Sequence, residues 1–124
     1  MADLEACASL CRAVYGFERT NELRDAIGAG TSFVAVREGR VSAYTSGLAL
    51  FGHTIAERED DVRALIVGVA QALREPVGFI LPTRQTNLFH WCLRERMRLV
   101  RPMTLMAIGE YPEPAGSWFP SSLC

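Results

Sequence analysis

The feature that most constrains the fold is a regular alternation of helix-like and strand-like segments along the chain. The clearest helix lies at 59–74, where Val62, Leu65 and Val69 repeat at helical spacing. The clearest strand contains 33–36, a run that is apolar on both faces, as in a sheet covered on both sides. Applied along the chain, these two patterns, helical spacing and short apolar runs, predict four helices and four strands. The helices are at 3–15, 20–27, 59–74 and 86–97, and the strands are at 31–37, 41–51, 77–81 and 99–109.

The order of these segments, α-α-β-β-α-β-α-β, predicts an α/β (α+β) domain. The turn at 38–40 joins two strands into an antiparallel hairpin, whereas the helix–strand–helix–strand second half implies some parallel pairing. We therefore expect a mixed sheet with helices on both faces. We expect a connector at 52–57 and an irregular tail that packs through Tyr111, Trp118 and Phe119.

Length and charge narrow the class of protein. The chain has 124 residues, of which 49% are hydrophobic, and this suits a single domain spanning 1–124. The net charge of -1 lacks the basic excess that is typical of nucleic-acid-binding domains. No apolar stretch approaches the roughly 20 residues that cross a bilayer. We therefore expect no nucleic-acid partner and no membrane partner.

The N-terminus and the cysteines favour a cytoplasmic location. Asp3 and Glu5 stand where a secretory signal would carry basic residues. The cysteines form no CxxC pair and have no histidine at metal-ligand spacing, so we expect buried thiols in a reducing compartment and no metal site. The four are Cys7, Cys11, Cys92 and Cys124.

Short motifs in a fixed order cover nearly the whole chain. They are LCR at 10–12 followed by YGFER at 15–19, FGHTIAE at 51–57, LPTR at 81–84 with LFHWCL at 88–93, RPMTLM at 101–106, and the end from GEY at 109–111 to PS at 120–121. In this order they resemble the GNAT acetyltransferase superfamily, and in particular the GNAT-like C-terminal half of two-module acetyltransferases. The resemblance implies a GNAT-like fold and, in active members, the use of acetyl-CoA.

The chain departs from this family at the loop that would hold the cofactor. In active members, a glycine-rich turn before the central helix binds the CoA pyrophosphate through backbone N–H groups. The matching stretch here, 56–61, reads AEREDD, with no glycine and four acids. Carboxylates repel a pyrophosphate, and Arg58 alone does not offset them. We therefore expect no bound cofactor.

Four side chains are candidates for a small-ligand site. His53 and Glu57 lie four residues apart after the long strand, and they form either a ligand-contacting acid–base pair or a local hydrogen bond that shapes the turn. Arg84 follows a strand and precedes a helix, where it either binds an anionic group or serves as a solvated or capping residue. Tyr44 either lines a pocket or belongs to the core.

Several other aromatic, methionine and cysteine side chains are expected to contribute to packing and not to a site. His90, Trp91 and Trp118 are candidates for lining a pocket, although such aromatic side chains belong more often to a core or an interface. Met103 and Met106 are expected to pack. Cys92 lies within an apolar helical face, which favours a buried, unreactive thiol. No nucleophilic triad is recognisable.

Two functional hypotheses follow, and a third stays open. The first is a non-catalytic module that binds a small ligand or serves assembly and forms a homodimer, because a two-fold dimer needs a single self-complementary patch. The second is an acyl-CoA-dependent N-acyltransferase, in which Glu57 or His53 removes the proton from a small amine and acetyl-CoA is the cofactor. The third is a chain that serves a separate partner protein.

Overall fold

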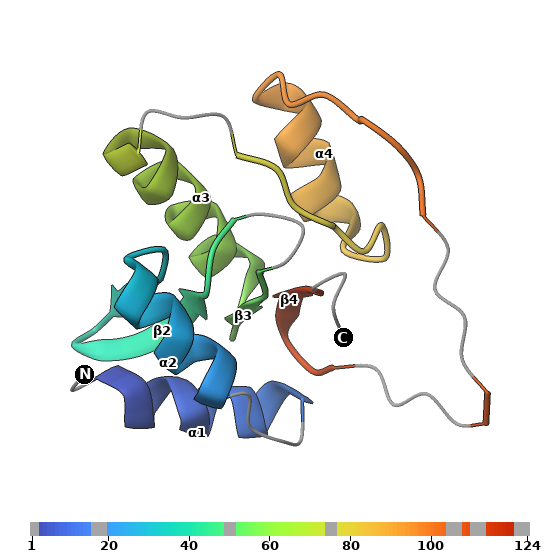
Figure 1. Cartoon of the computed structure of the whole chain (residues 1–124). Helices are drawn as coiled ribbons and strands as arrows, with labels where there is room; N and C mark the ends of the chain where they lie inside the picture. Colours follow the sequence, from blue (N-terminus) through green and yellow to red (C-terminus); the bar gives the residue numbers. More distant parts are fainter. Residues whose placement is uncertain are drawn as a thin grey trace.

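Four helices and a four-stranded sheet make up the described part of the protein, which we analysed as a computed structural model (Figure 1). The structure describes residues 3–15, 20–48, 52–73, 77–103, 108–109 and 114–120. In chain order the elements are α1 (Asp3–Tyr15), α2 (Thr20–Ala29), β1 (Phe33–Arg37), β2 (Arg40–Thr45), β3 (Thr54–Ala56), α3 (Glu59–Leu73), α4 (Thr86–Arg94) and β4 (Ser117–Phe119).

The strands lie in the order β1-β2-β3-β4, and each pairs antiparallel with its neighbour. β1 and β2 form a hairpin whose turn places Glu38 and Gly39 at positive φ. The register shifts between Ala35, which lies opposite Ala43, and Val36, which lies opposite Val41. Ser42 is therefore the extra residue of a β-bulge in β2.

Two apolar cores lie on opposite faces of the sheet. Because successive side chains of a strand point to opposite faces, β2, β3 and β4 each contribute to both cores. The residues that pack with α3 and α4 are Ala43, Ala56 and Phe119, and those that pack with α1 and α2 are Tyr44, Ile55 and Trp118. Figure 1 shows the two helix pairs on either side of the sheet.

Two glycines allow close backbone approaches at the ends of β3. A Cβ at Gly52 would collide with the carbonyl oxygen of Gly47. Gly116 has φ +76, and a Cβ there would lie 2.6 Å from the carbonyl oxygen of Ala56. Glycine meets both demands because it has no Cβ and tolerates positive φ.

The four predicted helices are confirmed, and their ends differ by at most three residues from the prediction. α4 is the one that ends early. Arg96 adopts φ +65, its N–H donates to Leu93, and the N–H of Met97 donates to the carbonyl of Cys92. This is a Schellman C-cap built on arginine instead of the usual glycine, so the sequence pattern carries no stop signal.

The predicted parallel pairing is wrong for the described strands, because the segment 77–81 stays outside the sheet. Val77, Phe79 and Leu81 pack against the core formed with α3 and α4, and the ring of Phe79 stacks on Phe119 at 4.3 Å between centroids. The alternating apolar pattern thus reflects side-chain packing without ladder hydrogen bonds.

The β1–β2 hairpin is extended instead by two segments that were predicted as a connector and as an irregular tail. β3 occupies the predicted connector and is fully buried, and β4 lies in the predicted tail. β2 ends at Thr45, well short of the predicted strand at 41–51, of which 49–51 lie outside the described residues. The tail packs through Trp118 and Phe119 as predicted; Tyr111 lies outside the described residues.

The predicted strand at 99–109 is wrong where it is described. Residues 99–103 run extended away from the body after α4 (Figure 1), and Leu99 and Val100 are exposed. Met103 was expected to pack and is instead 61% exposed. Residues 104–107, including Met106, lie outside the described part.

Within the described residues, the helices are too short and too polar for any of them to cross a bilayer.

Candidate functional site

Three of the four candidate residues, Tyr44, His53 and Glu57, belong to two polar clusters at opposite ends of β3. The first, here called the His53 cluster, consists of Tyr44, Thr45, Ser46, His53 and Thr54. The second, here called the carboxylate–arginine cluster, consists of Arg37, Arg40, Ser42, Glu57 and Asp61.

The His53 cluster is a buried hydrogen-bond network between β2 and the start of β3. His53 has no exposed surface, and Tyr44 is 1% exposed. The imidazole Nε2 lies 2.9 Å from the hydroxyl of Tyr44, and Nδ1 lies 3.3 Å from the hydroxyl of Ser46. The rings of Tyr44 and His53 meet edge to face. Both ring nitrogens of His53 are therefore engaged inside the protein.

The backbone around His53 is tied into the same network. Its N–H donates to Ser46 Oγ at 2.9 Å, and its carbonyl oxygen accepts from the N–H of Ser46 and from Thr45 Oγ1. Thr54 Oγ1 donates to Thr45 Oγ1 at 2.8 Å. Buried polar groups require such partners, so the cluster holds the β2–β3 connection together. A ligand could reach His53 or Tyr44 only after this network had opened.

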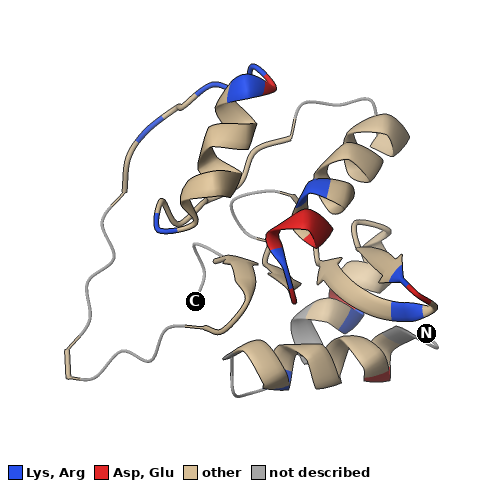
Figure 2. Ribbon diagram, turned by 180° about the vertical axis from the view of Figure 1, so that it is seen from behind, with Lys and Arg blue, Asp and Glu red and all other residues tan. Residues whose placement is uncertain are grey.

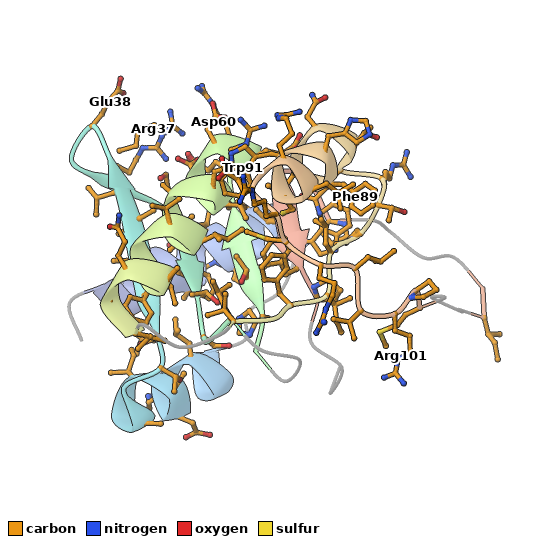
Figure 3. All side chains as sticks on the ribbon, turned by 90° about the horizontal axis from the view of Figure 1, so that it is seen from above. Arg37, Glu38, Asp60, Phe89, Trp91 and Arg101 are labelled. Carbon is orange, nitrogen blue, oxygen red and sulfur yellow. The ribbon has the colours of Figure 1, made fainter. Side chains whose placement is uncertain are left out.

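The carboxylate–arginine cluster joins the hairpin to the start of α3. Arg37 Nε lies 3.2 Å from Asp61 Oδ1, and its Nη2 lies 3.3 Å from Glu57 Oε1. Arg40 Nη1 bonds both carboxylate oxygens of Glu57, at 2.7 Å from Oε1. Ser42 Oγ donates to Asp61 Oδ1 at 3.0 Å. Figure 3 shows Arg37 turned toward the start of α3, while Glu38 points away from the hairpin tip.

Glu57 titrates abnormally as a result. The hydrogen bond and charge of Arg40 lower the pKa of Glu57 below its ordinary value, against the opposing effect of burial, and Arg37 and Arg58 add to the lowering. Glu57 in turn raises the pKa of Arg40. A carboxylate with a lowered pKa is a weak general base, because it holds a proton poorly.

The other two acids at the start of α3 also have protein partners. Glu59 Oε1 accepts the backbone N–H of Leu88 at 2.7 Å, so it caps α4, whose own N-cap residue, Gln85, makes no side-chain capping bond. Asp60 lies 3.6 Å from Arg63 Nη1. Figure 2 marks these acids on the first turn of α3 and the arginines of the hairpin. The stretch predicted to repel a pyrophosphate is thus balanced by arginines and committed to structural contacts.

Arg84 lies apart from both clusters, exposed in the turn that precedes α4. The next residue, Gln85, is 7% exposed and is a buried polar side chain that the sequence did not single out. Its Nε2 donates to the carbonyl of Trp118 at 2.8 Å, and its Oε1 accepts from the N–H of Trp118 at 3.3 Å and from the hydroxyl of Ser117. The amide pairs with β4 as an adjacent strand would.

The four predicted ligand-binding residues are therefore not one constellation. Tyr44 and His53 meet each other. His53 and Glu57 flank the extended β3, and four residues of strand span about 13 Å, so the two do not form the local pair considered from the sequence. Glu57 belongs to the carboxylate–arginine cluster, and Arg84 stands on a different segment.

Cys92 is buried as predicted, and burial raises the pKa of its thiol despite the opposing charge of Arg63. Cys7 and Cys11 are buried too, whereas Cys124 lies outside the described residues. No three His, Cys, Asp or Glu side chains come together as a metal-binding group in the described part of the chain.

Known proteins do not supply an identity: the sequence matches no protein-family model and no curated protein, and the structure matches no solved structure.

Proposed function

We propose that this chain is a non-catalytic GNAT-like module that serves assembly and acts as a homodimer in the cytoplasm. The observation that carries the proposal is that Glu57, Glu59 and Asp61, at the start of α3, are held by structural partners, while the exposed Asp60 pairs with Arg63 at the surface. In the GNAT superfamily, which the sequence motifs resemble, this is the position of the phosphate-binding turn.

The two candidate acid–base residues support the same conclusion. His53 is sealed in the His53 cluster, and the pKa of Glu57 is lowered by Arg40. Neither is suited to take a proton from an amine at neutral pH. Of the two roles expected for a non-catalytic module, the burial of Tyr44 and His53 favours assembly over small-ligand binding.

Exposed aliphatic side chains support self-association. Val36, Leu99 and Val100 are 61%, 61% and 82% exposed. Val36 lies on β1, whereas Leu99 and Val100 lie on the extended segment after α4, so the chain offers exposed apolar side chains to a second copy at two places. Light scattering coupled to size-exclusion chromatography should give the mass of two chains, and the mass of one chain at every concentration would contradict the homodimer.

The alternative function, an acyl-CoA-dependent N-acyltransferase, is tested by thermal shift with acetyl-CoA. A ligand present at 100 times its dissociation constant adds about 2.7 kcal/mol to the free energy of unfolding. We expect no shift at millimolar acetyl-CoA. A saturable shift that Glu57→Gln or Arg84→Ala reduces would overturn the non-catalytic proposal, and the exposed Arg94→Ala is the matched control.

A separate partner protein is the third outcome. If the chain is monomeric and acetyl-CoA has no effect, assembly with a different protein replaces self-assembly as the proposed role, and affinity purification from the native source identifies the partner.

A further inference from the structure

The two edges of the described sheet differ in how they are finished. At one edge, the backbone N–H and C=O of Trp118 in β4 point away from β3 and are both taken by the amide of Gln85. At the other edge, β1 pairs with β2, and no other described strand pairs with β1. An unpaired edge offers a row of backbone donors and acceptors to another strand.

Two apolar side chains of β1 are exposed beside its unpaired backbone edge. Val34 and Val36 are 38% and 61% exposed, and they share the face of Tyr44 and Val41, their partners in β2. On that face, the main contacts of α1 with the sheet are made with β2 and β3. Sheet edges are ordinarily guarded by charged residues, yet the single charged residue of β1, Arg37, is held by Asp61 and Glu57.

The pattern of β1 is symmetric about its centre. Its five residues alternate between half-buried and exposed, with Ala35 in the middle. Antiparallel pairing of two copies about a two-fold axis at Ala35 sets Val34 of one copy opposite Val36 of the other, twice, on the same face. β-branched residues are favourable cross-strand pairs, and an isologous contact needs this kind of self-complementarity.

We propose that β1 is the homodimer interface, pairing with β1 of a second copy to join two sheets into one. This inference rests on the proposed homodimer and specifies its surface. Five residues make a small contact compared with the roughly 1,200 Å² or more that stable interfaces bury. The dimer is therefore expected in equilibrium with monomer across the micromolar range.

Sedimentation equilibrium of paired charge variants tests the interface and its register. V34K/V36K places like charges opposite each other at both cross-strand positions, so it should be monomeric at concentrations where the wild type is dimeric. V34K/V36E places opposite charges there, so it should keep the dimer. Both valines are exposed, and circular dichroism checks that each variant is folded.

The control is V100K, which adds a charge to the other exposed aliphatic surface and should leave the dimer unchanged. Loss of the dimer in V100K, with V34K/V36K still dimeric, would move the interface to 99–103 and overturn the β1 proposal. Loss of the dimer in both double variants would overturn the register. If the wild type stays monomeric, the proposed homodimer itself is wrong. If V34K/V36K is still dimeric, only the proposed β1 interface is wrong.

Discussion

A single glycine sets how closely β4 approaches its neighbour. Gly116 combines a positive φ with a backbone contact to Ala56 that leaves no room for a Cβ. Gly39 has nearly the same φ, +75, but open space around it. The two positions separate the cost of the dihedral angle from the cost of the contact.

Gly116→Ala should therefore be more destabilising than Gly39→Ala. A left-handed φ costs an ordinary residue about 1–2 kcal/mol, and we expect that loss at both positions. At Gly116 the clash with Ala56 adds to it, for a total of about 2–4 kcal/mol. Urea denaturation measures both variants. Equal losses would mean that the strand shifts to make room.

The protonation of Glu57 makes the free energy of unfolding depend on pH. Because Arg40 lowers its pKa from the ordinary 4.5, the folded state favours the carboxylate. The contribution of Glu57 to the free energy of unfolding is fully present above about pH 4.5 and is lost as the pH falls through the lowered folded-state pKa.

Glu57→Gln should therefore reduce stability modestly at neutral pH and flatten the loss of stability below pH 4.5. Thermal denaturation from pH 7 to pH 2 gives the profile. Glu5→Gln, on the exposed side of α1, is the control and should preserve the wild-type slope. An unchanged slope in Glu57→Gln would mean that the pKa of Glu57 is the same in the folded and the unfolded chain, and would contradict its lowering by Arg40.

At the scale of elements, contacts far apart in sequence decide which segments enter the sheet. Gln85 reaches across 33 positions to finish β4 at Trp118. Glu59 lends α4 the cap that its own N-cap residue does not provide. Gln85, at the start of α4, and Glu59, at the start of α3, thus each satisfy backbone groups of another element.

Gln85→Ala should cost about 2–4 kcal/mol, because it leaves two buried backbone groups of Trp118 without their partners. Gln71→Ala, at an exposed position on α3, should cost less than about 0.5 kcal/mol. Hydrogen exchange should show faster opening of the Trp118 amide in Gln85→Ala. Unchanged exchange there would mean that water replaces the side chain without loss.

The helices were readable from the sequence, because stripes such as Val62, Leu65 and Val69 state locally which face is buried. β3 was not, because three residues between a histidine and a glutamate carry too little pattern. The carboxylate–arginine cluster was missed as well. Arg37 and Asp61 lie 24 residues apart, and no local period reports such pairing. The motif resemblance likewise carries no information on these contacts.

At the scale of the whole molecule, the sheet is shared by both cores. Trp91 packs beside the core formed with α3 and α4, whereas Trp118 lies in the core formed with α1 and α2. A substitution that destabilises one core should therefore also destabilise the other, because β2, β3 and β4 belong to both. We expect the described elements to unfold in one cooperative step, as small domains ordinarily do.

Leu65→Ala should lower the free energy of unfolding by about 2–5 kcal/mol, because Leu65 is 3% exposed. Tryptophan fluorescence of Trp91→Phe and Trp118→Phe backgrounds should give one common midpoint. Val67→Ala, on the exposed side of the same helix, is the control and should cost little. Separate midpoints would show two independently unfolding halves.

The side chain of Gln85 also limits stoichiometry. In the language of polymer chemistry, a unit with two reactive ends grows into a chain, and a unit with one end stops at a pair. With the β4 edge occupied by an amide, the described sheet has a valence of one. Under the proposed pairing through β1, assembly would therefore terminate at two copies and give a closed species, not a fibre.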